Sequence, residues 1–215
     1  MRTATSLLVA ASALALMSSP AGALQANPVH THIGHVATAF GNAPNGGSLL
    51  ATAQAEAATV SQHITLAERD MSNLQWMQTH AAHVLHALDP SQQAEGPGLG
   101  MGLIPAADAI AQHIELAAGS EGASENVGRH APHVAAAARA VSARAAEIAT
   151  LMVQVGRAGD YTTAEGLIFR ASALAKQLAP GNDVNGDGQI GWGDGEGGLD
   201  HVAQHVGFVV EGEGL

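Results

Sequence analysis

Histidine is the residue type in this sequence that offers the clearest chemistry. The chain has 215 residues, with 12 histidines, 8 lysines and arginines together, and no cysteine. Neutral imidazole is a common protein ligand of zinc, copper and nickel, and it also binds haem iron. The composition therefore indicates binding of a metal ion or a metal-containing cofactor. The lack of cysteine excludes disulfides, thiolate metal sites and covalently attached c-type haem.

Nine of the histidines belong to a repeated pattern. Residues 62–87 and 112–137 align without a gap, with ten identities in 26 positions. Each copy reads Gln-His-Ile-x-Leu-Ala, a 12-residue spacer, then His-Ala-x-His-Val. Outside the copies lie a third His-x-x-His-Val pair and a third Gln-His motif with a single histidine. Such self-similarity indicates repeated units. The candidate ligands of a transition metal or of haem iron are His32, His35, His63, His80, His83, His113, His130, His133 and His205.

The spacing of each His-x-x-His pair suits a shared site. Residues three apart on a helix lie on one face, with Cβ atoms about 5–6 Å apart. A single histidine cannot join the pair of its own copy within one straight helix, because the 17 residues from His63 to His80 would span about 25 Å. Antiparallel packing offers a solution, since it brings a pair on one helix beside a single histidine on another.

Three interpretations of these histidines compete. In the first, they hold transition metal ions such as Zn, Cu or Ni. In the second, two histidines from facing helices hold the iron of a non-covalent haem b, as in an electron-transfer protein. In the third, the chain is a calcium-stabilised structural or interaction protein whose histidines ligate nothing. Repetition in register favours ligation, and the low aromatic content of 3% favours metal ions over haem.

A second motif lies near the C-terminus. The run from Asp183 to Asp194 reads DVNGDGQIGWGD, with oxygen-bearing side chains at positions one, three, five and twelve and glycine at position six. It resembles an EF-hand calcium loop, and more closely the dockerin type. The resemblance implies calcium ligation by Asp183, Asn185, Asp187, Gln189 (through its backbone carbonyl) and Asp194.

The resemblance covers only this dozen residues and has two departures. Position twelve is Asp194 instead of the bidentate glutamate of an EF-hand, and Glu196 is an alternative closing ligand. A dockerin has two such loops and this chain has one, so no docking partner is implied. Calcium would order residues 182–196 and thereby fix the start of the segment 199–210, which carries His201 and His205.

The elements that must position these residues are helical. Apolar residues recur at intervals of three and four residues, as on one face of a helix. They do so in a short segment near 28–40 and in Leu49–Leu88, Ala106–Ala118, His133–Val155 and Thr163–Leu178. Breaks rich in glycine and proline separate these segments. We predict an all-α fold, an antiparallel helical bundle with a C-terminal EF-hand-like calcium loop. Residues 24–180 would form the histidine-rich bundle, and residues 181–215 the calcium loop and a short helix.

The first 23 residues are typical of a secretory signal. Arg2 precedes an apolar run from Leu7 to Met17, and Ala21-Gly22-Ala23 forms a small-residue cleavage signature. The mature protein would be periplasmic or secreted. Beyond this leader, no stretch is long and apolar enough to span a membrane.

Composition and motifs exclude other classes of function. The formal net charge of −11 argues against nucleic acid as a partner, because binding to duplexes depends on basic residues. The sequence contains no nucleophile elbow, Walker loop or dinucleotide fingerprint. We therefore predict binding of metal ions or haem rather than catalysis, and any redox activity would have to use the histidine sites.

Overall fold

The fold is all-helical, as predicted. The computed structural model describes residues 27–215, in which no strand occurs. Residues 1–23, predicted to be a signal, lie outside the described range. The α-helices are α1 (Pro28–Ala37), α2 (Leu49–Ala67), α3 (Leu74–Leu88), α4 (Leu103–Gly119), α5 (Glu125–Arg157), α6 (Tyr161–Ala175) and α7 (Leu199–Glu213).

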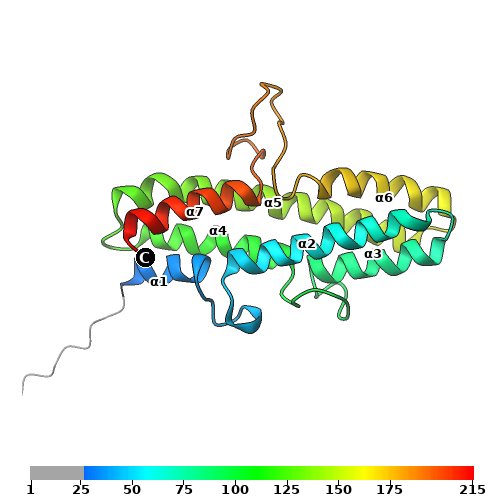
Figure 1. The fold of residues 1–215 in the computed structure, drawn as a ribbon, viewed down its shortest axis with the longest axis horizontal. Coiled ribbons are helices and arrows are strands. Elements are labelled where there is room, and N and C mark those ends of the chain that lie inside the picture. The colour runs from blue at the N-terminus through cyan, green and yellow to red at the C-terminus, as the bar shows by residue number, and fades with distance from the viewer. Residues whose placement is uncertain (1–26) are drawn as a thin grey trace, which may run out of the picture.

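The helices lie side by side along the long axis of the molecule (Figure 1). The longest helix, α5, has 33 residues; α7 packs on one part of it and α6 on another. Helix α1 packs against α4 and α7 at one end, and α2 packs against α3. The segment between α6 and α7 projects away from the helices (Figure 1). Within residues 27–215, no helix has both the length and the apolar character needed to cross a membrane.

The predicted stretch Leu49–Leu88 is two helices. Helix α2 ends at Ala67, a short 3₁₀ turn covers Glu68–Asp70, and α3 begins at Leu74. The side chain of Asn73 accepts a hydrogen bond from the backbone N–H of Trp76 and so caps α3. This break lies inside the 12-residue spacer and allows the histidines on either side of it to approach one another.

Small apolar side chains fill the core. Alanine is the most frequent of its buried members, with valine, isoleucine, leucine and methionine making up the rest. Alanine has helix-forming propensity and little bulk, which suits closely packed helices. Among the fully buried large side chains are Ile110 on α4 and Ile148 and Met152 on α5.

Two buried glutamates organise the two long connections. Glu56 is fully buried, and its Oε1 accepts hydrogen bonds from the backbone N–H groups of Leu99, Met101 and Gly102. Glu196, 4% exposed, accepts hydrogen bonds from the backbone N–H groups of Val184, Asn185 and Gly191. Each connection therefore wraps around a carboxylate, which compensates for the lack of regular backbone pairing.

The connection before α7 is also tied to α5. The guanidinium of Arg144 is 8% exposed and donates hydrogen bonds to the backbone carbonyls of Gly195 and Gly197 on one side and Gln177 on the other. Burial lowers the pKa of Arg144 from its ordinary value. This cation fixes the base of the projecting segment on the long helix.

Candidate metal centres

The nine predicted histidines gather into three triads. Site 1 is His32, His35 and His113; site 2 is His63, His80 and His83; site 3 is His130, His133 and His205. In each site an i,i+3 pair from one helix meets a single histidine from another: α1 with α4, α3 with α2, and α5 with α7. We call the single member, His113, His63 or His205, the central histidine of its site.

The Nδ1 atoms of each site converge. The Nδ1 of the central histidine lies 2.9 and 3.3 Å from the two Nδ1 atoms of its pair in site 1. The corresponding distances are 3.0 and 3.3 Å in site 2 and 3.1 and 3.4 Å in site 3. Two nitrogens bound to one tetrahedral ion at about 2.0–2.1 Å lie about 3.3–3.4 Å apart. In each site one of the two separations from the central histidine matches this spacing and the other is slightly shorter.

Hydrogen bonding between imidazoles does not account for this convergence. A neutral imidazole nitrogen carries either one proton or one lone pair. The Nδ1 of a central histidine can therefore form one good hydrogen bond to its pair, while the structure places two Nδ1 atoms beside it in every site. A cation bound to all three Nδ1 atoms, with the proton of each ring on Nε2, would account for both short distances.

The local sequence explains where these side chains lie. Each of the nine histidines is followed directly by a buried apolar residue. These residues are Ile33, Val36, Ile64, Ala81, Val84, Ile114, Ala131, Val134 and Val206. Neighbouring residues on a helix point about 100° apart. A histidine placed just before a core residue therefore lies at the edge of the core, half in contact with packed side chains and half toward solvent.

Burial makes the central histidines weak bases. His63 and His205 are each 9% exposed. Burial, and then the charge that their neighbouring histidines would carry, lowers the pKa of each to about 4. The pKa of His113 is lowered for the same reasons. These side chains are neutral at pH 7, which is the form that binds metal.

Three histidines of the pairs follow the same trend. Burial is the main cause that lowers the pKa of His32, His80 and His133, and the neighbouring histidine of the same pair contributes in each case. The Nε2 of His80 is buried without a hydrogen-bond partner among the described residues. A proton on that nitrogen, as Nδ1 ligation requires, would lie in the apolar surroundings of site 2.

Aromatic residues flank all three sites. The sequence contains only 2 Trp, 1 Tyr and 3 Phe, and four of these six contact the triads. Ring centroids are 5.2 Å apart for Phe40 and His113, 4.4 Å for Trp76 and His80, 5.2 Å for Phe208 and His130, and 3.9 Å for Trp192 and His133. Sequence reasoning missed this role. Helical spacing could have indicated Trp76 and Phe208, which lie four and three residues from a site histidine.

The three histidines outside the repeat hold other parts of the fold. Nδ1 of His86 lies 2.8 Å from the carbonyl oxygen of Gln93, and Nε2 of His201 lies 3.0 Å from that of Ile190. His30 lies 3.4 Å from the carboxylate of Glu213 at the other end of the chain. Their contacts stabilise connections and helix ends.

The sequence repeat does not correspond to two equivalent sites. In the first copy, the central histidine and the pair form site 2 together, because the turn after Ala67 folds α3 back on α2. In the second copy they separate: His113 joins the pair on α1, while His130 and His133 join His205 on α7. Helices α1 and α7 pack against α4 and α5 and supply the missing members.

Four of the five predicted calcium ligands, all but Asp183, line a hollow between the projecting segment and α5. This hollow of about 550 Å³ is lined by Asn185, Asp187, Gln189 and Asp194, among others. The carboxylate of Asp183 accepts hydrogen bonds from the backbone N–H groups of Gly186 and Gly188 and so shapes the first turn.

Glu196, the alternative closing ligand, binds the backbone of the projecting segment. Both carboxylate oxygens of Glu196 accept backbone N–H bonds, Oε1 from Val184 and Asn185 and Oε2 from Gly191. Glu196 therefore organises the backbone of the segment, and both Glu196 and Asp194 line the hollow.

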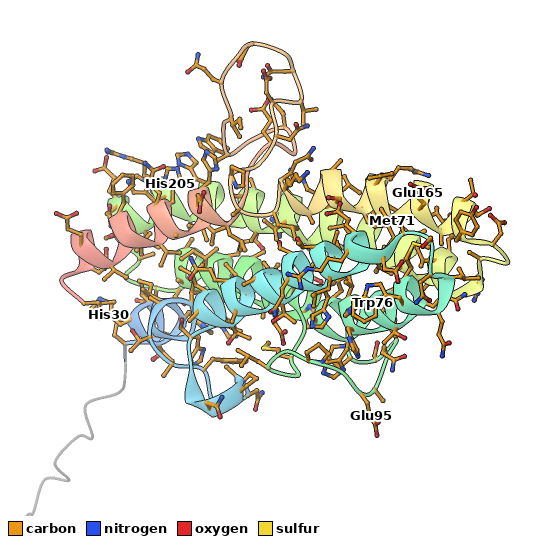
Figure 2. All side chains as sticks on the ribbon, turned by 45° about the vertical axis from the view of Figure 1, so that its right-hand side comes forward. His30, Met71, Trp76, Glu95, Glu165 and His205 are labelled. Carbon is orange, nitrogen blue, oxygen red and sulfur yellow. The ribbon has the colours of Figure 1, made fainter. Side chains whose placement is uncertain are left out.

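The projecting segment lies next to site 3. Figure 2 labels His205 near the base of this segment and Trp76, beside site 2, farther along the molecule.

Comparison of the chain with protein-family models, with curated proteins and with solved structures gives no match.

Proposed function

We propose that this protein binds divalent transition metal ions, three per chain, one at each histidine triad. The observation that carries the proposal is the convergence of three Nδ1 atoms in every site, with separations of 2.9–3.4 Å from the central histidine. All-imidazole donor sets suit Zn, Cu and Ni. In each site the central histidine has a lowered pKa, so it can bind an ion without first losing a proton.

The same geometry gives less support to haem. A bis-histidine haem places its two imidazoles on opposite sides of the porphyrin plane. Here one ring nitrogen from each of the three histidines lies within 4.8 Å of the other two, and Nδ1–Nδ1 contacts near 3 Å leave no space for a macrocycle between them. The third imidazole would also have no role. A haem-based electron-transfer function is therefore the weaker proposal.

The helix arrangement predicted from the sequence belongs to this proposal. In an antiparallel bundle, a pair on one helix faces a single histidine on its neighbour. The short connection between α2 and α3, and their packing against each other, support that arrangement at site 2. Each site then joins two helices, so a bound ion would also stabilise the packing.

Calcium binding by the projecting segment is the second part of the proposal. The hollow lined by Asn185, Asp187, Gln189 and Asp194 supports it, as does the oxygen-only character of these donors, which calcium prefers. An exported location, predicted from residues 1–23, would expose the site to the high calcium levels outside cells.

Metal titration with defined variants tests the histidine sites. Protein stripped with chelator, loaded with Zn²⁺ or Cu²⁺ and desalted should carry three ions per chain by elemental analysis. The variants His32→Ala/His35→Ala, His80→Ala/His83→Ala and His130→Ala/His133→Ala should each lose one ion. The control His30→Gln changes a histidine outside the sites and should retain three. If the pair variants bind as many ions as the control, the histidines are structural.

A further inference from the structure

Each triad provides three donors and no more. Among residues 27–215, no aspartate, glutamate or further histidine joins any of the three donor groups. Structural zinc sites are closed by four protein ligands, whereas sites with three protein ligands keep an open position for water or another ligand. An ion of coordination number four or higher therefore needs at least one donor from outside the chain at every site.

The burial pattern leaves each triad accessible to this outside donor from the solvent. The central histidines His63 and His205 are nearly buried, while His35, His83 and His133, one from each pair, remain partly exposed. Every site histidine precedes a core residue, so the protein interior lies on one side of each triad and solvent on the other. We therefore expect the missing ligand position on the solvent side.

The charge of the loaded site determines which donor it favours. Three neutral imidazoles leave the full 2+ charge of a divalent ion uncompensated, since no carboxylate belongs to the triads. Such an ion acidifies bound water and attracts anions. A small monodentate anion, or water in its place, meets both the geometric and the electrostatic requirement.

We infer that each loaded triad is a binding site for one small monodentate anion, which completes the coordination of the ion from the solvent side. The inference rests on the proposed metal binding and deepens it. An open position lets a competing ligand attach before the histidines release the ion. The sites are then suited to acquiring and passing on metal, in contrast to closed structural sites.

Azide is a suitable probe for copper-loaded protein. Protein loaded with Cu²⁺ and desalted should develop an azide-to-copper charge-transfer band on titration, saturating at one azide per copper and three per chain. The variant His80→Ala/His83→Ala should saturate at two, in step with its copper content, and the control His30→Gln at three. An unchanged spectrum at saturating azide, with three coppers still bound, would overturn the inference.

The kinetics of metal removal give a second, independent measurement. With an open position, the rate of Zn²⁺ transfer to a chelator should rise in proportion to chelator concentration, because the chelator attacks the bound ion directly. A rate independent of chelator concentration would mean that the ion must dissociate first, and would contradict the open position. Failure to bind Cu²⁺ or Zn²⁺ at all would instead overturn the proposed function, so the two outcomes are distinguishable.

Discussion

The indole ring of Trp192 stacks on the imidazole ring of His133, with centroids 3.9 Å apart and planes 18° apart. Trp192 belongs to the segment that resembles a calcium loop, and His133 belongs to site 3. A second contact joins the same regions, since Nε2 of His201 lies 3.0 Å from the carbonyl oxygen of Ile190. The order of the segment and the geometry of site 3 are therefore physically linked.

Removing this stack should weaken site 3. Aromatic pairs contribute about 0.5–1.5 kcal/mol, so Trp192→Ala should lower the metal affinity of site 3 by about 2- to 10-fold. The measurement is Zn²⁺ competition with a chelator in protein whose pairs in sites 1 and 2 are replaced by alanine. Trp76→Ala, which acts beside site 2, is the matched control and should leave site 3 unchanged. Equal affinity of Trp192→Ala and the parent at site 3 would show that the stack has no role in binding.

Calcium should stabilise the protein through the projecting segment. Calcium at about ten times its Kd adds about 1.4 kcal/mol to the free energy of unfolding, which raises Tm by about 3–6 °C. Asp183→Ala/Asp187→Ala should abolish this rise and make residues 182–196 sensitive to protease in the presence of calcium. Asp89→Ala/Asp160→Ala changes two aspartates outside the segment and should keep the calcium-dependent rise in Tm. If the first variant keeps that rise too, the calcium assignment is wrong.

Combined variants should reveal which histidines share an ion. His113→Ala should cost one ion, as His32→Ala/His35→Ala does, and the combination of all three changes should still cost only one, because they belong to site 1. His113→Ala combined with His130→Ala/His133→Ala should cost two. Elemental analysis of desalted protein measures both. The reverse pattern would mean that the two halves of the second repeat copy bind one ion together.

The metal-free protein should lose stability in mild acid. The folded-state pKa values of His63 and His205 are about 4, below the value of about 6.5 expected for the unfolded chain. Between these values the unfolded chain binds more protons, so the free energy of unfolding falls as pH decreases from about 6.5 to 4, with each histidine contributing on the order of 1 kcal/mol per pH unit. Stability from this source is complete above pH 6.5.

Urea denaturation in the presence of chelator at several pH values measures this dependence. His63→Gln/His205→Gln should flatten it in the window from pH 6.5 to 4, because glutamine does not titrate. A slope in this window that is the same with and without His63 and His205 would assign the acid sensitivity to other groups.

The sequence alone determined the local structure of this protein, which comprises its helices and the placement of the histidine pairs on them. Helical periodicity and capping residues specify the all-α class, and the i,i+3 spacing places both imidazoles of each pair on one face. The buried apolar residue after each histidine, such as Ile64 after His63, then sets that face at the core boundary. Such features depend on a few neighbouring residues, so they can be recognised without a structure.

Only the tertiary structure decided which single histidine completes which pair. The repeat would associate His113 with His130 and His133, yet His113 meets the pair on α1, whose His32 lies 81 residues away in sequence. This choice depends on how the apolar faces of α1, α4, α5 and α7 pack, which is the sum of many weak contacts spread over the chain. Trp192 reaches His133 for the same reason: the core and Arg144 hold the projecting segment over site 3, and no spacing in the sequence encodes that contact.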